Sequence, residues 1–275
     1  MPLICISSPK GGVGKTTLAA NIAYEMACTG ARVVALDADP QNELCLHFGL
    51  PLRDRRGLMP ELRTSGRWQL AMRRTECGVW VIPYGESATS AGPAGNVNAM
   101  EAGAFQSVIQ DILADNITTI VVDTPPGPSA ALASIIPFTD TLVTVLLADA
   151  ASAALMPVVE QGRFYGPTLG TARGVRHGYV LNQLNPLSRL SRITAEAVQR
   201  HVQGRLIGTV IRDEFVAEAV ASQRPVAVFA PASRAARDIA GIAQALTLRL
   251  PARPQRERAV PTSEPATREW SGQQT

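Results

Sequence analysis

One glycine-rich stretch, Ser7 to Leu18, constrains the fold of this chain more than any other segment. It follows a short apolar run, Leu3 to Ile6, and leads into an alanine-rich pattern typical of a helix. Three glycines within four residues let successive backbone N–H groups point inward, and the following helix adds the positive end of its dipole. The order strand, glycine-rich loop, helix therefore predicts a site for a chain of phosphates.

Two side chains after the glycines have the chemistry that such a site requires. Lys15 would reach the β- and γ-phosphates, and the Thr16 hydroxyl would be a ligand of Mg²⁺. The alternative, a chance glycine-rich turn, does not explain the position of the stretch between a strand and a helix. The residues expected to line the phosphates are Gly11, Gly12, Val13, Gly14, Lys15, Thr16 and Thr17.

The strict P-loop pattern fails at one position, where Pro9 replaces a glycine. The stretch fits Lys-Gly-Gly-x-Gly-Lys-Thr-Thr instead, the deviant Walker A motif, and in this the chain resembles the ParA/MinD family of P-loop ATPases. The resemblance implies ATP and Mg²⁺ as cofactors, weak Mg-dependent hydrolysis, and a homodimer that sandwiches ATP. It also implies a catalytic role for Lys10 at the partner's nucleotide. Lys10 and Lys15 are the only lysines of the chain, which suggests that a compact ammonium is kept where a planar guanidinium would not fit.

Two acidic segments follow strand-like apolar runs. Asp37 and Asp39 come after the run from Arg32 to Leu36, and Asp123 comes after Ile117 to Val122. In an open parallel sheet the carboxyl ends of strands face the ligand, so these carboxylates should meet the phosphate loop. Asp37 could instead cap a helix or form a turn.

The family resemblance assigns roles to these carboxylates. It makes Asp-x-Asp-Pro the first switch, where Asp39 is catalytic and positions the attacking water and Mg²⁺. It makes Asp123, in Asp-x-Pro-Pro-Gly, the Walker B carboxylate of the Mg²⁺ shell and the start of the second switch. The metal ligands implied in this way are Thr16, Asp39 and Asp123.

Three residues in the second half of the chain match positions around the adenine in that family. Asn182 follows a short strand, and Arg212 with Asp213 resembles the loop under the adenine ring. Asn182 could instead cap the helix that begins near Ser188. Ile211 stands where the family has a proline, so this chain departs from the family pattern at that pocket.

The remaining sequence predicts one α/β domain over residues 1–250, with a doubly wound, mainly parallel sheet of about seven to eight strands flanked by helices. Hydrophobic residues make up 46% of the 275 residues, enough for a sizeable core. Apolar runs such as Thr141 to Leu147 have strand length. Residues 251–275 lack apolar periodicity and should be disordered.

The arginine-rich run from Arg53 to Arg74 is either a solvated helix face or a docking surface for an acidic partner.

The composition indicates a reducing, cytoplasmic setting. The four cysteines show no CxxC pairing, and Cys5 and Cys28 fall in patterns that predict burial. The segment before the phosphate loop is too short for a signal sequence, and no apolar stretch approaches membrane-spanning length. We therefore expect a soluble protein that reaches the inner membrane only through partners.

Scattered blocks, including Leu46 to Leu50 and Gln223 to Val226, resemble the bacterial cellulose-synthase-operon ATPases of the BcsQ group. This resemblance implies a cytoplasmic accessory of the cellulose synthase and secretion complex. The runner-up is a partitioning ATPase that binds non-specific DNA, although its net charge of +3 does not demand such a partner. Less favoured alternatives are a division-site regulator and a scaffold that binds ATP without hydrolysing it. The arginines that could contact DNA are Arg189, Arg192, Arg200, Arg205, Arg234 and Arg237.

Overall fold

The computed structural model describes residues 2–51, 56–86, 99–114, 118–165 and 174–250. Its strands form one eight-stranded sheet in which all neighbours are parallel except β3 and β4. In spatial order the strands are β3 (Arg73–Arg74), β4 (Trp80–Ile82), β2 (Arg32–Asp37), β5 (Thr118–Asp123), β1 (Leu3–Ser7), β6 (Thr141–Leu147), β7 (Arg176–Leu184) and β8 (Leu206–Ile211).

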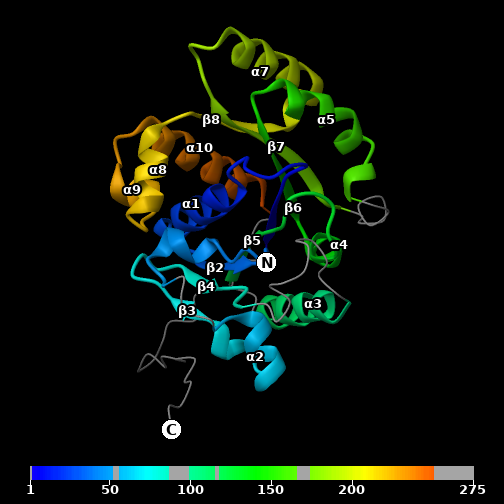
Figure 1. Cartoon of the computed structure of the whole chain (residues 1–275), viewed down its shortest axis with the longest axis vertical. Coiled ribbons are helices and arrows are strands. Elements are labelled where there is room, and N and C mark those ends of the chain that lie inside the picture. The colour runs from blue at the N-terminus through cyan, green and yellow to red at the C-terminus, as the bar shows by residue number, and fades with distance from the viewer. Residues whose placement is uncertain (1, 52–55, 87–98, 115–117, 166–173, 251–275) are drawn as a thin grey trace, which may run out of the picture.

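Helices connect the strands and cover both faces of the sheet (Figure 1). The described α-helices are α1 (Lys15–Cys28), α2 (Leu58–Thr64), α3 (Ala99–Leu113), α4 (Ala130–Ile135), α5 (Ala150–Glu160), α7 (Arg189–Val202), α8 (Glu214–Ala221), α9 (Val226–Phe229) and α10 (Arg234–Arg249). Short 3-10 helices are η1 (Leu44–Phe48), η2 (Trp68–Ala71), η3 (Ile136–Phe138), η4 (Arg163–Tyr165) and η5 (Gln203–Arg205).

The core has two layers because alternate residues of each strand point to opposite faces. In β1, Leu3 and Cys5 belong to the layer that contains α2 to α5 and α7, whereas Ile4 and Ile6 belong to the layer that contains α1, η1 and α8 to α10. Strands buried on both faces read as continuous apolar runs, as expected for a parallel sheet. The predicted fold class is thereby confirmed, including a central strand with the limits Thr141–Leu147.

β1 lies between β5 and β6, so the loops that follow these three strands emerge side by side at one edge of the sheet. The register also pairs Asp37 at the end of β2 with Asp123 at the end of β5. The sheet therefore brings the phosphate loop and both predicted acidic segments to the same edge, as ligand sites in such sheets require.

Two expectations are wrong. The arginine-rich run is not one helix face, because its described part is divided among α2, η2 and β3, and Arg63 and Arg73 donate hydrogen bonds to the carbonyls of Glu86 and Leu70. Cys28 is exposed rather than buried, because the inward side of α1 carries other residues and Cys28 ends the helix.

Some expectations lie beyond what the structure describes. The predicted disordered tail, residues 251–275, falls outside the described residues. Within them, no helix is long and apolar enough to cross a bilayer. Cys5 is buried as predicted, and burial raises the pKa of its thiol.

Candidate active site

The phosphate loop runs from the end of β1 to the first residue of α1. Gly12 and Gly14 have φ angles of 71° and 86°, in the left-handed region that favours glycine. A methyl group added at Gly12 would meet no heavy atom within 4 Å. Lys15, the first residue of α1, has only 5% of its surface exposed. The loop thus forms an open backbone cradle at a helix N-terminus with one buried ammonium, an arrangement suited to phosphates.

Lys10 lies beside the cradle and is held by a residue from a distant part of the chain. Its Nζ is 2.7 Å from Oδ2 of Asp149. Asp149 also caps α5, because its Oδ1 accepts the Ser152 N–H at 2.7 Å. Burial opposes ionisation of Asp149, but the hydrogen bonds from Lys10 and Ser152 outweigh it and lower the pKa of the carboxyl. Lys10 therefore has an intramolecular counter-ion that is itself fixed by a helix.

The first acidic segment contains one structural and one accessible carboxylate. Asp37 is fully buried and accepts the N–H groups of Asp39 at 2.9 Å and Leu44 at 3.1 Å. Burial, and then the charge of Asp123, raise the pKa of Asp37 well above its ordinary value. Asp39 is partly exposed, and one of its oxygens accepts the Gln41 N–H at 3.0 Å. The turn-forming alternative for Asp37 thus agrees with its contacts, and Asp39 is the carboxylate available to a ligand.

Asp123 is the least satisfied charged group of the site. Its exposure is 1%, and neither carboxylate oxygen has a hydrogen bond of good geometry to any described residue. Burial raises the pKa of Asp123 to about 7, while the Thr16 hydroxyl and the Lys15 ammonium act in the opposite direction. Buried polar groups without partners are rare in folded proteins. A cation placed against Asp123 would supply the missing interaction.

The donor set fits Mg²⁺ that arrives with a nucleotide. Thr16, Asp39 and Asp123 offer only oxygen atoms, which Mg²⁺ prefers. Among the described residues there is no group of three or more His, Cys, Asp or Glu side chains able to hold a metal by themselves. Mg²⁺ is commonly bound by one or two carboxylates together with phosphate oxygens and water. The residues present therefore suit a metal whose shell phosphates complete.

Asn182 contacts the phosphate loop directly. Its Nδ2 donates a 2.8 Å hydrogen bond to the carbonyl of Val13, and its amide packs so closely on Gly14 that any larger residue there would collide with it. Ser188, not Asn182, caps α7. The capping alternative for Asn182 is therefore wrong, and its contact with adenine remains a prediction.

Arg212 and Asp213 follow β8, the neighbour of β7, so their loop lies beside the one that carries Asn182. Asp213 accepts the N–H groups of Phe215 and Ala235, each at 3.1 Å, and so joins α8 to α10. The Arg212 side chain is 65% exposed and is 4.0 Å from Glu214. Asp213 has a structural role here, whereas the exposed Arg212 is the better placed of the two for a ligand.

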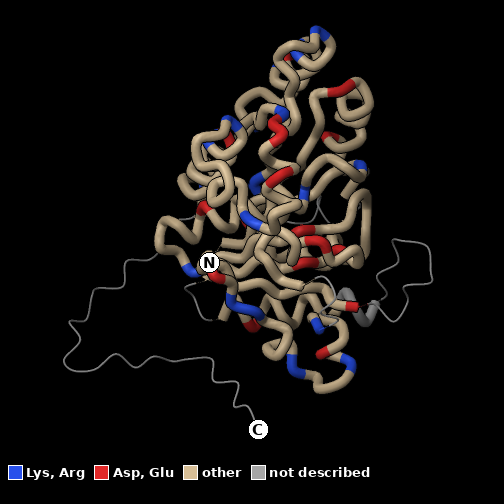
Figure 2. The backbone as a smooth tube through the Cα atoms, turned by 60° about the vertical axis from the view of Figure 1, so that its left-hand side comes forward, with Lys and Arg blue, Asp and Glu red and all other residues tan. Residues whose placement is uncertain are grey.

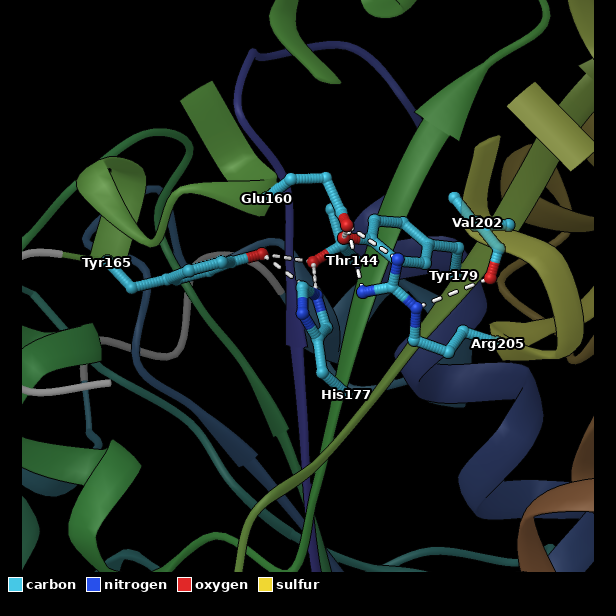
Figure 3. Close-up of polar contacts among 7 residues, drawn as sticks. All are labelled: Thr144, Glu160, Tyr165, His177, Tyr179, Val202 and Arg205. Carbon is cyan, nitrogen blue, oxygen red and sulfur yellow. Dashed lines mark hydrogen bonds and ion pairs between the residues drawn. The ribbon is translucent and has the colours of Figure 1, made fainter. Parts of the chain in front are cut away.

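Sequence reasoning missed Asp149 and a polar group between β6 and β7, which we call the β6–β7 polar cluster. It consists of Thr144, Glu160, Tyr165, His177, Tyr179 and Arg205 (Figure 3). The Tyr165 and Thr144 hydroxyls bond each other, and Thr144 lies 2.8 Å from His177 Nε2. Tyr165 also reaches Ser7, at the end of β1, at 3.4 Å. Only the Asp-x-x-Ser pattern at residue 149, a helix-capping signal, could have pointed to any of these residues.

The other half of the cluster is centred on Glu160. Arg205 donates to both of its carboxylate oxygens, at 3.0 Å and 2.5 Å, and the Tyr179 hydroxyl donates to it as well. The Arg205 guanidinium lies 5.5 Å from the centre of the Tyr179 ring. Burial opposes ionisation of Glu160, but Arg205 and Tyr179 lower its pKa. Burial lowers the pKa of the adjacent His177 to about 4, so this histidine is neutral at neutral pH.

Known proteins resemble this chain over most of its length. A family model described as "Cellulose biosynthesis protein BcsQ" matches residues 1–246. The cellulose biosynthesis protein BcsQ of Salmonella typhi is 25% identical over 245 residues, covering 88% of this chain and 93% of that protein. The chromosome partitioning protein ParA of Caulobacter vibrioides is 26% identical over 245 residues, covering 82% and 86%.

Solved structures share the fold. The septum site-determining protein MinD from Pyrococcus horikoshii, in complex with Mg-ADP, has a TM-score of 0.71 to this chain at 21% identity. The match covers 89% of this chain and 95% of that one. The chain therefore shares the fold of that structure.

Proposed function

The chain belongs to the family of the cellulose biosynthesis protein BcsQ, and we propose that it is an ATP-dependent switch whose bound nucleotide joins two copies of the chain. By family and fold it is a P-loop ATPase of the ParA/MinD type. The observation that carries the proposal is Asp123, a buried carboxylate without a hydrogen-bond partner among the described residues, at the edge where Lys15 opens α1.

Each site residue has a distinct task in this proposal. The N–H groups of residues 11–16 and the Lys15 ammonium bind and neutralise the β- and γ-phosphates. When bound, Mg²⁺ would neutralise phosphate charge and fix the orientation of the phosphates, held by Thr16 and, through its shell, by Asp39 and Asp123. Asp39, which is partly exposed, orients the attacking water. Asn182 holds the loop and contacts the adenine together with Arg212, while Asp213, which joins α8 to α10, keeps the Arg212 loop in place.

Lys10 supplies the link between nucleotide and dimer. Its ion pair with Asp149 is partly exposed, with 26% and 40% of the two side chains accessible. Exposed ion pairs contribute only about 0–1 kcal/mol, so a triphosphate can readily take the place of Asp149. In the dimer, Lys10 would leave Asp149 and neutralise the nucleotide of the partner subunit, like an arginine finger supplied in trans. Nucleotide binding and assembly would then be thermodynamically linked.

The test separates Lys10 from Lys15. We expect Lys15→Ala to abolish binding of a non-hydrolysable ATP analogue, whereas Lys10→Ala should bind the analogue but remain a monomer in light scattering. Phosphate release should fall at least tenfold in both variants, because each loses charge neutralisation in the transition state. Dimers and normal turnover in Lys10→Ala would sink the sandwich proposal. Tight analogue binding without any phosphate release in the unmodified protein would favour the scaffold alternative.

For the cellular process, we propose an accessory role in cellulose synthesis and secretion. The family and the Salmonella relative, both described as cellulose biosynthesis proteins, support it. The protein would act from the cytoplasm and bind secretion components at the inner membrane. Capture of synthase subunits by the tagged chain, and loss of cellulose in cells that carry only Lys15→Ala, are the expected results. Normal cellulose output in those cells would contradict this role.

DNA partitioning is the second candidate, supported by the similarity to the Caulobacter protein. Two of the six arginines considered for DNA binding have other partners, since Arg205 pairs with Glu160 and Arg234 with Asp238. The others are divided between α7 and α10, which weakens the case for one continuous basic face. Salt-sensitive, ATP-dependent retention on random-sequence DNA would nevertheless favour partitioning.

A further inference from the structure

The turn before α7 and the first half of that helix present large apolar side chains to solvent. Leu187 is 93% exposed, Leu190 59% and Ile193 48%. Their spacing of three residues places Leu190 and Ile193 on one side of the helix, and the exposed Ala197 continues that side. Single exposed apolar residues are normal, but three neighbouring ones form a patch that calls for an explanation.

This apolar stripe is not the core-facing side of α7. The buried residues of the helix are Ser191, Thr194, Val198 and Val202, and the last two join the core layer that covers β7. α7 therefore already has a packed face, and the stripe is a second apolar face. Burial of the first face accounts for the stability of the helix, so the exposed leucines serve something outside it.

The turn that carries Leu187 is well ordered by hydrogen bonds. Leu187 N–H donates to Asn185 Oδ1 at 3.0 Å, and Ser188 N–H donates to the Asn185 carbonyl at 3.1 Å. The Asn185 N–H in turn donates to Ser191 Oγ at 3.1 Å. Leu187 thus projects from a fixed backbone, and its near-complete exposure means that it is not part of a groove wall.

Two arginines flank the stripe. Arg189 and Arg192 are exposed, and neither forms an ion pair with any residue that the structure describes. Both lie in the first turn of α7, which has no acidic residue. Cations at a helix N-terminus oppose the helix dipole and weaken the helix. These two charges are therefore unfavourable within the protein and available to an external anion.

α7 also lies at one end of the longest axis of the molecule, far from α2 at the other end (Figure 1). Figure 2 shows Lys and Arg segments at that same end, together with Asp or Glu segments, and Glu196 is an exposed acidic residue of α7. A flat surface such as a bilayer can contact this end of the molecule without contacting the rest of the protein. Projecting leucines next to arginines match a bilayer, in which an apolar interior lies under anionic head groups.

We propose that residues 185–193 form a contact surface for an anionic lipid bilayer. Leu187, Leu190 and Ile193 enter the head-group boundary, and Arg189 and Arg192 bind lipid phosphates. The contact is weak and reversible because it includes only three large apolar side chains and two charges. It does not depend on nucleotide or on the dimer, so it can be tested even if the proposed switch fails.

The experiment is co-sedimentation of the full chain, without nucleotide, with vesicles of phosphatidylcholine containing phosphatidylglycerol or of phosphatidylcholine alone. We expect binding to the anionic vesicles, at least tenfold weaker binding to the neutral ones, and loss of binding at high salt. Leu187→Ser with Leu190→Ser, and separately Arg189→Glu with Arg192→Glu, should each reduce binding at least tenfold. Because all four side chains are exposed, the leucine variant should unfold at the same temperature as the unmodified chain. The arginine variant should unfold at the same or a slightly higher temperature, since acidic residues in the first turn favour the helix dipole.

Matched controls lie on α10. Leu248 is 80% exposed and Arg237 is exposed, so Leu248→Ser and Arg237→Glu make the same kinds of substitution, one residue at a time, at another place. Both controls should bind vesicles normally. Equal loss in the controls, or no loss in the residue 187–192 variants, would overturn the proposal. The proposal would also be overturned if the unmodified chain did not bind the vesicles but was retained on DNA or on polyglutamate, and the arginine variant lost that retention.

Discussion

Two polar clusters lie on the same sheet and differ in how well their hydrogen-bonding groups are paired. At the nucleotide edge, Asp123 has no hydrogen-bond partner among the described residues, and its pKa is raised to about 7. In the β6–β7 polar cluster, Glu160 accepts hydrogen bonds from Arg205 and Tyr179, and its pKa is lowered. Asp123 in the first cluster therefore needs a ligand to supply its missing interaction, whereas Glu160 in the second cluster finds its partners within the protein.

The largest effect should come from Lys15→Ala, which removes the buried ammonium of the first cluster. With MgATP at about a thousand times its Kd, binding to the folded state raises the free energy of unfolding by about 4 kcal/mol. We expect the variant to lose nearly all of this gain in thermal unfolding measured with and without MgATP. Lys10→Ala, as the control, should keep most of it. If Lys15→Ala were stabilised as much as the unmodified chain, the first cluster would not be a nucleotide site.

Asp123→Asn should stabilise the nucleotide-free protein. The folded pKa of about 7 lies above the ordinary value of 3.8, so the folded state binds the proton more tightly and its stability falls as pH rises from about 4 to 7. The amide removes this penalty, a gain of up to about 4 kcal/mol at pH 8 that is nearly absent at pH 4. Denaturant unfolding at both pH values measures it. A destabilised variant at pH 8 would show that Asp123 is already paired.

His177→Gln should change the pH response in the opposite sense. The folded pKa of His177, about 4, lies below the ordinary 6.5, so the folded state resists protonation and the protein loses stability as pH falls from about 6.5 to 4. Without this histidine, the loss over that window should shrink by about 2 kcal/mol. Urea unfolding across the window, compared with the unmodified chain, measures the change. An unchanged slope would mean that His177 is not held neutral by its surroundings.

Glu160→Gln should destabilise the protein without affecting nucleotide binding. The variant leaves Arg205 without its carboxylate partner, at a cost of about 1–2 kcal/mol, reduced from the buried-pair value because Arg205 is 43% exposed. Glu218→Gln, at an exposed position on α8, serves as the control and should have no effect on stability. Calorimetry gives the stability, and fluorescence titration gives the affinity for ATP. Weaker nucleotide binding in Glu160→Gln would break the distinction between the two clusters.

The smallest effect on stability should come from Asp149→Ala. It removes the cap of α5 and a partly exposed ion pair, together about 1 kcal/mol. The same change frees Lys10, so ATP-dependent dimerisation should need less protein than in the unmodified chain. Asp149→Asn keeps the cap but weakens the ion pair, and it should show the dimer effect without most of the stability loss. Weaker dimers in both variants would mean that Asp149 helps assembly rather than competing with it.

The sequence predicted the first cluster but not the second. Lys15 and Thr16 lie in one local motif, and Asp37, Asp39 and Asp123 directly follow apolar runs, so spacing along the chain was enough. The Lys10–Asp149 pair joins residues 139 positions apart and exists because β6 lies next to β1. Periodicity identifies strands but does not give their order in a sheet.

The same limit explains the missed cluster. The β6–β7 polar cluster combines side chains from residue 144 to residue 205, which approach each other only once β6, β7 and β8 are aligned. The expected burial of Cys28 is wrong for a different reason. An alanine-rich helix gives a weak periodic signal, and this signal is least reliable at the end of the helix. The limits of β6 could be predicted from the sequence, because this strand is a mainly apolar run bounded by polar residues.

The two lysines give this protein a built-in chemical reporter. An acylating reagent has only two ε-amino groups to modify in the whole chain, and both border the phosphate cradle. Lys10 is accessible and Lys15 is 5% exposed, so the ratio of the two adducts in a mass spectrum records the shielding of each amine separately. Loss of labelling at residue 10 alone would follow subunit contact in real time, without a dye or an engineered cysteine.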